Sequence, residues 1–158
     1  MNSRSNTWLP GAGFTLIEVL VALAVLAVGL LGLASLMLGG LQVTRSALQH
    51  TLATALVNDM ADHIRANRPA AAAYALTAGT ELDPPAASCA TPGECSPALL
   101  AALDLYRWQS AARAALPEAQ TSIAVTTDAS GAQTCAITLQ WRQSGDAAPA
   151  TATVTVLV

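Results

Sequence analysis

The sequence is poor in charged and aromatic residues. Only 11% of its 158 residues are charged, against about 25% in an average soluble protein. Aromatic residues make up 4%, and much of the 53% hydrophobic fraction is Ala, which buries little area. The formal net charge of −3 gives no indication of a nucleic-acid partner, because such partners select for strongly basic surfaces.

Charged side chains are absent from Val19 to Thr44. This apolar run is longer than the roughly 20 residues that a helix needs to cross a bilayer. It is about twice as long as the 7–15-residue apolar region of a secretory signal peptide. The polar stretch before it contains Arg4 and no acidic residue, which favours a cytoplasmic location for that end. The sequence therefore predicts a single-pass membrane helix near the N-terminus.

The helical pattern continues beyond the apolar run. Apolar residues recur every four positions, at Leu48, Leu52, Leu56, Met60 and Ile64, and this repeat predicts one apolar stripe along the helix. No proline occurs before Pro69 within this pattern, and Arg65 and Arg68 would lie in the last turn, where cations are favourable. We expect one helix from Phe14 to Arg68, roughly 80 Å long at about 1.5 Å per residue, with roughly half of it in the membrane.

A second helix is predicted after a loop. Residues 77–98 are rich in Pro, Gly, Ser and Thr and are typical of a loop. Ser96 followed by Pro97 resembles an N-cap and first helical position, and the helix that follows would end before Pro117. Leu99, Leu103 and Tyr106 are the expected core residues of this helix.

Three strands are predicted in the last third of the chain, at residues 121–128, 135–142 and 151–158. In each strand apolar residues alternate with polar ones, as in Cys135, Ile137, Leu139 and Trp141. Strands with one polar face predict an antiparallel meander packed on a helix. The fold class is therefore α+β, with a long N-terminal helix packed on a small antiparallel sheet.

The chain has three cysteines, all beyond the apolar run. If this part is exported, the compartment is oxidising and a disulfide can form. Cys89 and Cys95 flank Pro92-Gly93, a turn signal that would bring them together, so we expect these two to pair. Cys135 shares strand parity with core residues and is expected to stay reduced as a small hydrophobic side chain.

No catalytic site stands out in the sequence. His50 and His63 would point to nearly opposite helix faces, and Cys89-x5-Cys95 is not a usual zinc spacing. Asp62 and Arg65 are expected to form an ion pair on a helix surface, and Trp108 and Trp141 to lie in the core. We therefore expect no enzyme activity, no catalytic or metal-binding residue, no cofactor and no small-molecule substrate.

The most informative residues precede the apolar run. Gly13 is followed by Phe14, then by Thr-Leu-Ile, and then by Glu18. A carboxylate in the first turns of a membrane helix costs several kcal/mol, about 3 on insertion scales, unless it is paired or protonated. Glu18 alone would be compatible with a tolerated interfacial acid, but the combination of a polar leader, a small residue, an aromatic residue and one acid is specific.

The stretch from Gly13 to Ala34 resembles the class III signal of type IV prepilins and of type II secretion pseudopilins. The resemblance implies that a prepilin peptidase cuts after Gly13 and methylates the new N-terminal residue, Phe14. It also implies that Glu18 neutralises the N-terminal amine of a neighbouring subunit during assembly. This role is physically reasonable, because a buried acid and a buried ammonium are each costly alone and tolerable as a pair.

Further segments resemble PilV-like minor pilins, also called type IV pilus modification proteins. These segments are the apolar run, the stretch Met60–Asn67 (MADHIRAN), the cysteine loop and LAALDLYRWQ. The resemblance implies a leader at residues 1–13, a membrane and assembly helix at 14–44, its periplasmic half at 45–68 and a globular α+β head at 69–158. It implies an inner-membrane protein with a periplasmic head that later joins the pilus with other minor pilins and the major pilin.

Two other classes of protein are compatible with the sequence. A type II secretion pseudopilin shares the N-terminal signal, although the Asp-x-x-Arg-Ala-Asn stretch and the cysteine loop favour the minor pilin. A membrane-anchored, adhesin-like binding protein is the alternative from a different class, and adhesion is also compatible with a pilin.

Overall fold

A computed structural model describes residues 13, 15–86, 89, 95–143 and 148–158. The described chain contains three helices and three strands. They are α1 (Leu16–Ala66), the 3-10 helix η1 (Arg68–Tyr74), α2 (Pro97–Ala115), β1 (Gln120–Thr127), β2 (Gln133–Trp141) and β3 (Ala150–Leu157). The chain divides into two compact units, residues 1–43 and residues 44–158, and α1 belongs to both. We call residues 16–43 the apolar segment and residues 44–158 the head.

The apolar segment is helical throughout and buries none of its residues. Its large side chains are open to their surroundings, with Leu16 82% and Leu36 74% exposed. By length and composition α1 is able to cross a membrane. A helix that is apolar on all sides is stable only inside a membrane or among other chains, so this segment needs an apolar environment that the described residues do not provide.

The helix α1 ends two residues earlier than the sequence predicts. It stops at Ala66, and Asn67 adopts a non-helical conformation with φ −117° and ψ 45°. Arg68 therefore begins η1 and does not lie in the last turn of α1. The reason is Pro69, which offers no N–H for the next helical bond and whose ring would crowd the carbonyl of residue 65, four positions before it, in a continued α-helix. At the other end, Phe14 lies outside the described residues.

The helix α2 begins as the sequence predicts. Ser96 is its N-cap, and the Ser96 hydroxyl accepts a hydrogen bond of 3.2 Å from the Leu99 N–H. The expected core stripe is right only at Leu103, which is buried. Leu99 and Tyr106 are half-buried, and the other apolar residues that α2 buries are Ala101, Leu105, Trp108 and Ala112. The buried face of α2 alternates small residues such as Ala101 and Ala112 with large ones such as Trp108. The small residues allow α2 to pack closely on its neighbours. A search for large apolar residues alone therefore does not identify this face.

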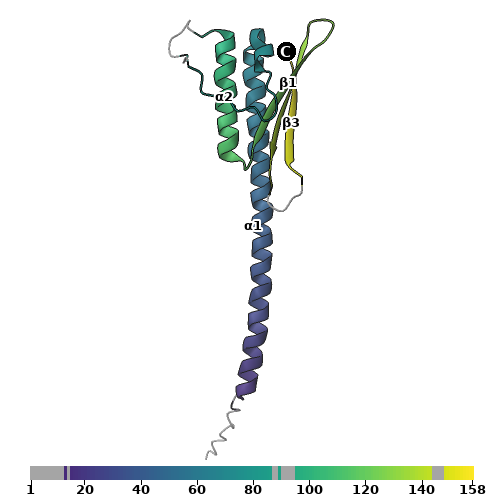
Figure 1. Cartoon of the computed structure of the whole chain (residues 1–158). Helices are drawn as coiled ribbons and strands as arrows, with labels where there is room; N and C mark the ends of the chain where they lie inside the picture. The colour runs from purple at the N-terminus through teal and green to yellow at the C-terminus, as the bar shows by residue number, and fades with distance from the viewer. Residues whose placement is uncertain (1–12, 14, 87–88, 90–94, 144–147) are drawn as a thin grey trace, which may run out of the picture. The chain divides into compact units, whose positions relative to one another are not determined.

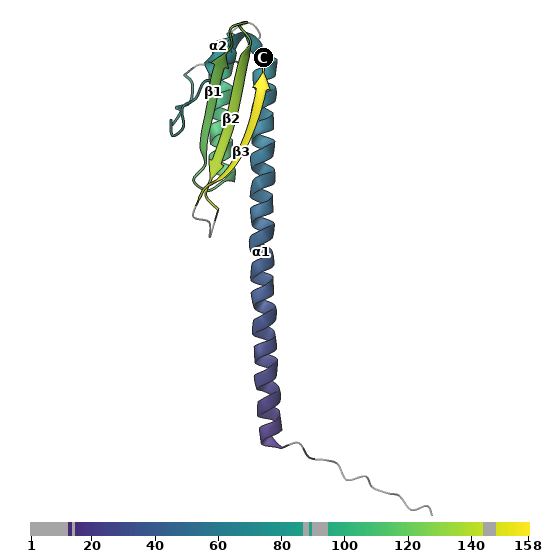
Figure 2. The same ribbon diagram turned by 90° about the vertical axis from the view of Figure 1, so that its right-hand side faces the viewer.

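The sheet is an antiparallel meander with the order β1-β2-β3. Its register is continuous, from Gln120 opposite Gln140 in one ladder to Trp141 opposite Ala150 in the other. Burial alternates along β2, where Cys135, Ile137, Leu139 and Trp141 are fully buried. The predicted strands and their core face are thereby confirmed. Figure 1 shows the sheet on one side of the head and α2 on the other, and Figure 2 looks onto the sheet, with its three strands side by side.

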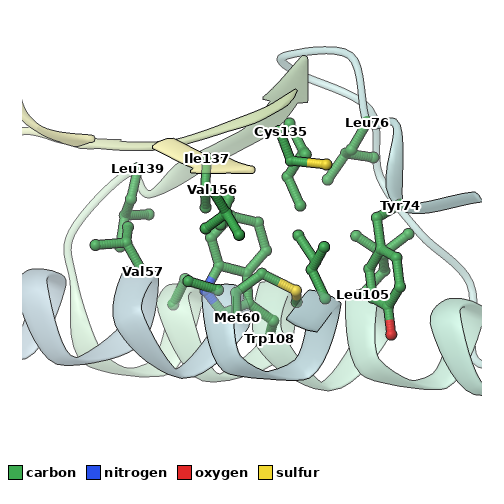
Figure 3. Packing of buried hydrophobic residues seen from close by; sticks show 14 of the residues in the cluster. Val57, Met60, Tyr74, Leu76, Leu105, Trp108, Cys135, Ile137, Leu139 and Val156 are labelled. Carbon is green, nitrogen blue, oxygen red and sulfur yellow. The ribbon is translucent and has the colours of Figure 1, made fainter. Parts of the chain in front are cut away.

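The head has one continuous core between the sheet and the helices (Figure 3). From α1 it receives Ala53, Val57, Met60, Ala61 and Ile64. The stripe predicted from the four-residue repeat is wrong in its first half, because Leu48 is 58% and Leu52 37% exposed. At about 100° per residue, a step of four advances about 40°. Leu48 therefore lies about 160° from Ile64, on nearly the opposite face.

Candidate assembly site and polar joint of the head

The predicted assembly residue, Glu18, lies in the first turn of α1 and is exposed. Its backbone N–H bonds to the Thr15 carbonyl at 3.1 Å and to the Thr15 hydroxyl at 3.4 Å. Thr15 thus caps the helix, and the spacing Thr-x-x-Glu is that of a capping box. This signal is readable in the sequence, although the helix was expected to begin at Phe14. An acid in this position is also favoured by the positive end of the helix dipole.

The two other residues of the motif are less informative in the structure. Gly13 is exposed, and a Cβ added there would meet no described atom within 4 Å. Phe14, the predicted methylation site, lies outside the described residues. Glu18 is the only residue with a charged side chain in the sequence between Gly13 and Thr44.

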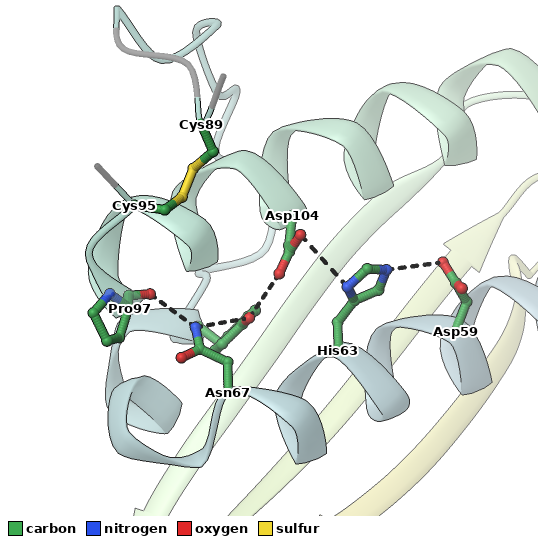
Figure 4. Close-up of polar contacts among 8 residues, drawn as sticks. Asp59, His63, Asn67, Cys89, Cys95, Pro97 and Asp104 are labelled. Atoms are coloured by element: carbon green, nitrogen blue, oxygen red, sulfur yellow. Dashed lines mark hydrogen bonds and ion pairs between the residues drawn. A yellow bond between two sulfur atoms is a disulfide. The ribbon is translucent and has the colours of Figure 1, made fainter. Parts of the chain in front are cut away.

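A buried polar network joins the three helical elements of the head (Figure 4). The Tyr74 hydroxyl donates to the Asp104 carboxylate at 2.8 Å. The Asn67 amide donates to the Tyr74 oxygen at 3.2 Å and to the Pro97 carbonyl at 2.8 Å. Tyr74 is fully buried, and Asn67 and Asp104 are 5% and 4% exposed. We call these four residues the polar joint, since they connect the end of α1, η1 and the start of α2.

The environment of Tyr74 changes its acidity. Burial raises the pKa of Tyr74 to about 12, and the nearby Asp104 carboxylate adds to this effect, while the bond from Asn67 opposes it. The neutral phenol is the form that can donate a hydrogen bond to Asp104, so burial and the negative neighbour favour the same form. The polar joint is therefore complete at neutral pH.

His63 lies at the edge of the polar joint between two carboxylates. Its Nδ1 is 3.5 Å from Asp104 and its Nε2 is 3.7 Å from Asp59. His50 lies elsewhere, with its ring edge against Trp141 at a centroid distance of 4.9 Å. In the described part of the chain, no group of three or more His, Cys, Asp or Glu side chains could hold a metal ion.

A second buried amide fastens the loop after η1 to α2. Gln109 accepts from the Leu82 N–H at 2.9 Å and donates to the Thr80 carbonyl at 2.8 Å. It also donates to the Thr121 hydroxyl of β1 at 3.1 Å. These contacts pair the Leu82 N–H and the Thr80 carbonyl and hold this loop against α2 and β1. Neither Gln109 nor the polar joint was predicted, because an isolated polar residue in a helix does not reveal its partners.

The remaining predicted side chains are placed as follows. Cys89 and Cys95 form a disulfide with a Cα–Cα distance of 5.2 Å. Cys135 is a free, buried thiol whose pKa is raised by burial. Arg65 and Asp62 form the predicted surface ion pair at 2.6 Å. Trp108 and Trp141 both lie in the core.

The chain matches two family models. One describes type IV pilin Tt1218 and matches residues 35–106. The other describes the prokaryotic N-terminal methylation motif and matches residues 11–34. No curated protein and no solved structure matches the chain. The two adjoining matches, together with the long apolar helix and the three-stranded sheet, identify the chain as a type IV pilin with a class III signal at its N-terminus.

Proposed function

We propose that this pilin is a minor subunit of the type IV pilus, of the PilV type, that helps to initiate or assemble the filament. One observation carries the proposal: the apolar segment is fully exposed, while the head completes its own core. A chain built in this way can stay anchored in a membrane by its apolar segment. Its apolar segment can later pack against the helices of other subunits in place of lipid. It acts as a structural subunit and not as an enzyme.

We propose the following processing and location. A prepilin peptidase removes residues 1–13 by cutting between Gly13 and Phe14, and methylates Phe14. Residues 14–44 anchor the mature chain in the inner membrane, residues 45–68 continue the helix into the periplasm, and residues 69–158 form the globular part. The match to the methylation motif supports this scheme, because it includes Gly13, Phe14 and Glu18.

In the assembled state, the Glu18 carboxylate would form an ion pair with the N-terminal ammonium of a neighbouring subunit. Its position in the first turn of α1 supports this role, since the cleaved N-terminus of an adjacent helix at similar depth would lie within reach. Other minor pilins and the major pilin are the proposed partners. A type II secretion pseudopilin is the alternative, because the same N-terminal chemistry would serve that assembly.

The test is mass spectrometry of the mature chain, together with co-purification from sheared pili. We expect an N-terminal methyl-Phe14, and we expect Gly13→Leu to leave an unprocessed precursor in the membrane. Gly13 has open space around it, so this variant tests recognition by the peptidase and not folding. A mature chain that starts at another residue would contradict the processing scheme. Co-purification with secretion components, and not with pilins, would favour the pseudopilin.

A further inference from the structure

The outer edge of β3 presents a regular row of backbone groups. Gln133 and Val158 exchange both of their backbone hydrogen bonds, at 2.8 and 3.2 Å. In an antiparallel pair, bonded and non-bonded positions alternate. The register then places the N–H and C=O groups of Thr151, Thr153, Thr155 and Leu157 on the side away from β2. Within the described chain, none of these outward groups has a hydrogen-bond partner.

This edge lacks the features that usually prevent strands from pairing. Proteins protect a free edge with charged side chains, prolines, bulges or a covering segment. β3 contains no charged residue and no proline, and its ladder with β2 is unbroken over all eight residues. The side chains of the four outward residues are exposed. The opposite edge of the sheet differs, because Leu76 exchanges two bonds of 2.9 Å with Ile123 and covers β1 at its middle.

We propose that the β3 edge binds an extended, uncharged strand from the head of a different pilin, so that one sheet continues through two subunits. This inference rests on the proposed function, which brings other pilin heads next to this one. The main-chain groups would supply affinity, and the Thr side chains would favour β-branched or hydroxyl neighbours across the new ladder.

A second copy of this chain fits the edge less well. Two β3 strands related by a two-fold axis would pair antiparallel. Within the head, residues 44–66 of α1 run in the same general direction as β3 (Figure 2). Such a dimer would therefore point its two α1 helices in opposite directions, which two chains anchored in one membrane cannot do. A continuous ladder between β3 and β1 of another copy would be interrupted at Ile123, whose outward backbone groups already bond to Leu76.

The experiment compares Thr153→Pro with Thr153→Val in the full-length processed chain. The Thr153 N–H points away from β2, so the only backbone donor that proline removes is an outward one, and proline is tolerated on an edge strand. Valine keeps that donor. Both variants lose the hydrogen bond between the Thr153 and Thr138 hydroxyls, so this loss does not distinguish them. We expect Thr153→Pro to reduce co-purification of the partner pilin about tenfold, since the ring and the missing N–H disrupt adjacent bonds. Thr153→Val should bind as the wild type does.

Hydrogen exchange of the wild-type chain provides a second measurement that does not depend on a variant. In the free protein, the amides of the four outward residues should exchange faster than those of Ala152, Val154 and Val156. They should become protected in the complex. Unchanged exchange in the complex, or wild-type binding by Thr153→Pro, would overturn the edge proposal. The edge proposal would also be overturned if Thr153→Pro abolished a homodimer of this chain but left the binding of other pilins intact. If wild type itself bound no pilin, the proposed function would fail instead.

Discussion

The apolar segment and the second half of α1 belong to one helix but differ in burial. From residue 16 to residue 43 every residue is exposed, whereas the part of α1 in the head buries Ala53, Val57, Met60, Ala61 and Ile64. The two parts differ in how many described residues of the same chain pack against them. The head supplies a sheet and a second helix, so a narrow face is sufficient there. None of the described residues buries any part of the apolar segment, and a helix that is apolar on every side is suited to a membrane or to the company of other helices.

This difference implies that substitutions in the two regions have separate effects. A change in the apolar segment should alter assembly and leave the stability of the head unchanged. A change in the core should unfold the head and leave processing unchanged. Variants in each region can test this separation.

The largest effect is expected for Glu18→Ala. Removing one member of a buried ion pair costs about 3–5 kcal/mol, which would lower a docking equilibrium by more than about a hundredfold. We expect the variant to be cleaved normally and to be missing from sheared pili, with the melting temperature of the extracted protein unchanged. Glu18→Gln is the matched control, because it keeps the size of the side chain and should fail in the same way. Normal incorporation of both variants would show that Glu18 is only an interfacial acid.

The next effect concerns Leu139→Ala in β2, compared with Leu31→Ala in the apolar segment. Leu139 is fully buried and Leu31 is 71% exposed. A buried Leu→Ala change costs about 2–5 kcal/mol through lost transfer energy and a residual cavity. Thermal unfolding of the detergent-extracted chain should show a clear loss for Leu139→Ala and none for Leu31→Ala. Equal losses would mean that the two regions unfold as one unit.

Alkaline pH should destabilise the head through Tyr74. Its pKa is about 10 in the unfolded chain and about 12 in the fold, so the folded state holds the proton more tightly. The stabilisation is complete below pH 10 and is lost as the pH rises toward 12, by roughly 3 kcal/mol in total, since a difference of one pKa unit corresponds to about 1.4 kcal/mol. Urea unfolding at several pH values measures it.

Tyr74→Phe provides the control for that measurement. The phenylalanine variant cannot ionise, so its stability should vary less between pH 10 and pH 12, although it loses the bond to Asp104 at neutral pH. Cys135 also has a raised pKa and adds a slope of the same sign, which Cys135→Ala would remove. A pH dependence that survives in Tyr74→Phe would assign the alkaline transition to other groups.

The smallest of these effects is expected for the disulfide. A bond between Cys89 and Cys95 closes a short loop, and the chain-entropy model gives about 1–3 kcal/mol for it. Replacing both cysteines with serine should lower stability by that amount without changing assembly. Peptide mapping without reductant should find this pair joined and Cys135 free. A bridge that includes Cys135 would show that the assignment is wrong.

The sequence alone determined the features that depend on local pattern. The charge-free run from Val19 to Thr44 is longer than a bilayer requires, so the membrane helix could be inferred from length. The alternation in β2 has a period of two that matches the strand repeat without drift, which is why its core face was predicted correctly. Ser96 caps the helix through its own hydroxyl, and Pro97 has a fixed φ that suits the first helical position. Both effects act within one turn, so the start of α2 was also readable.

Only the tertiary structure decided the features that depend on distant residues. A repeat of four does not match 3.6 residues per turn, so the sheet and α2 selected the buried face of α1, and Leu48 was left outside. The polar joint brings together Asn67, Tyr74 and Asp104, and Gln109 reaches Thr80 and Thr121. These partners lie 7 to 30 positions apart along the chain. Hydrogen bonds over such separations follow from how the elements pack, and no local pattern in the sequence encodes them.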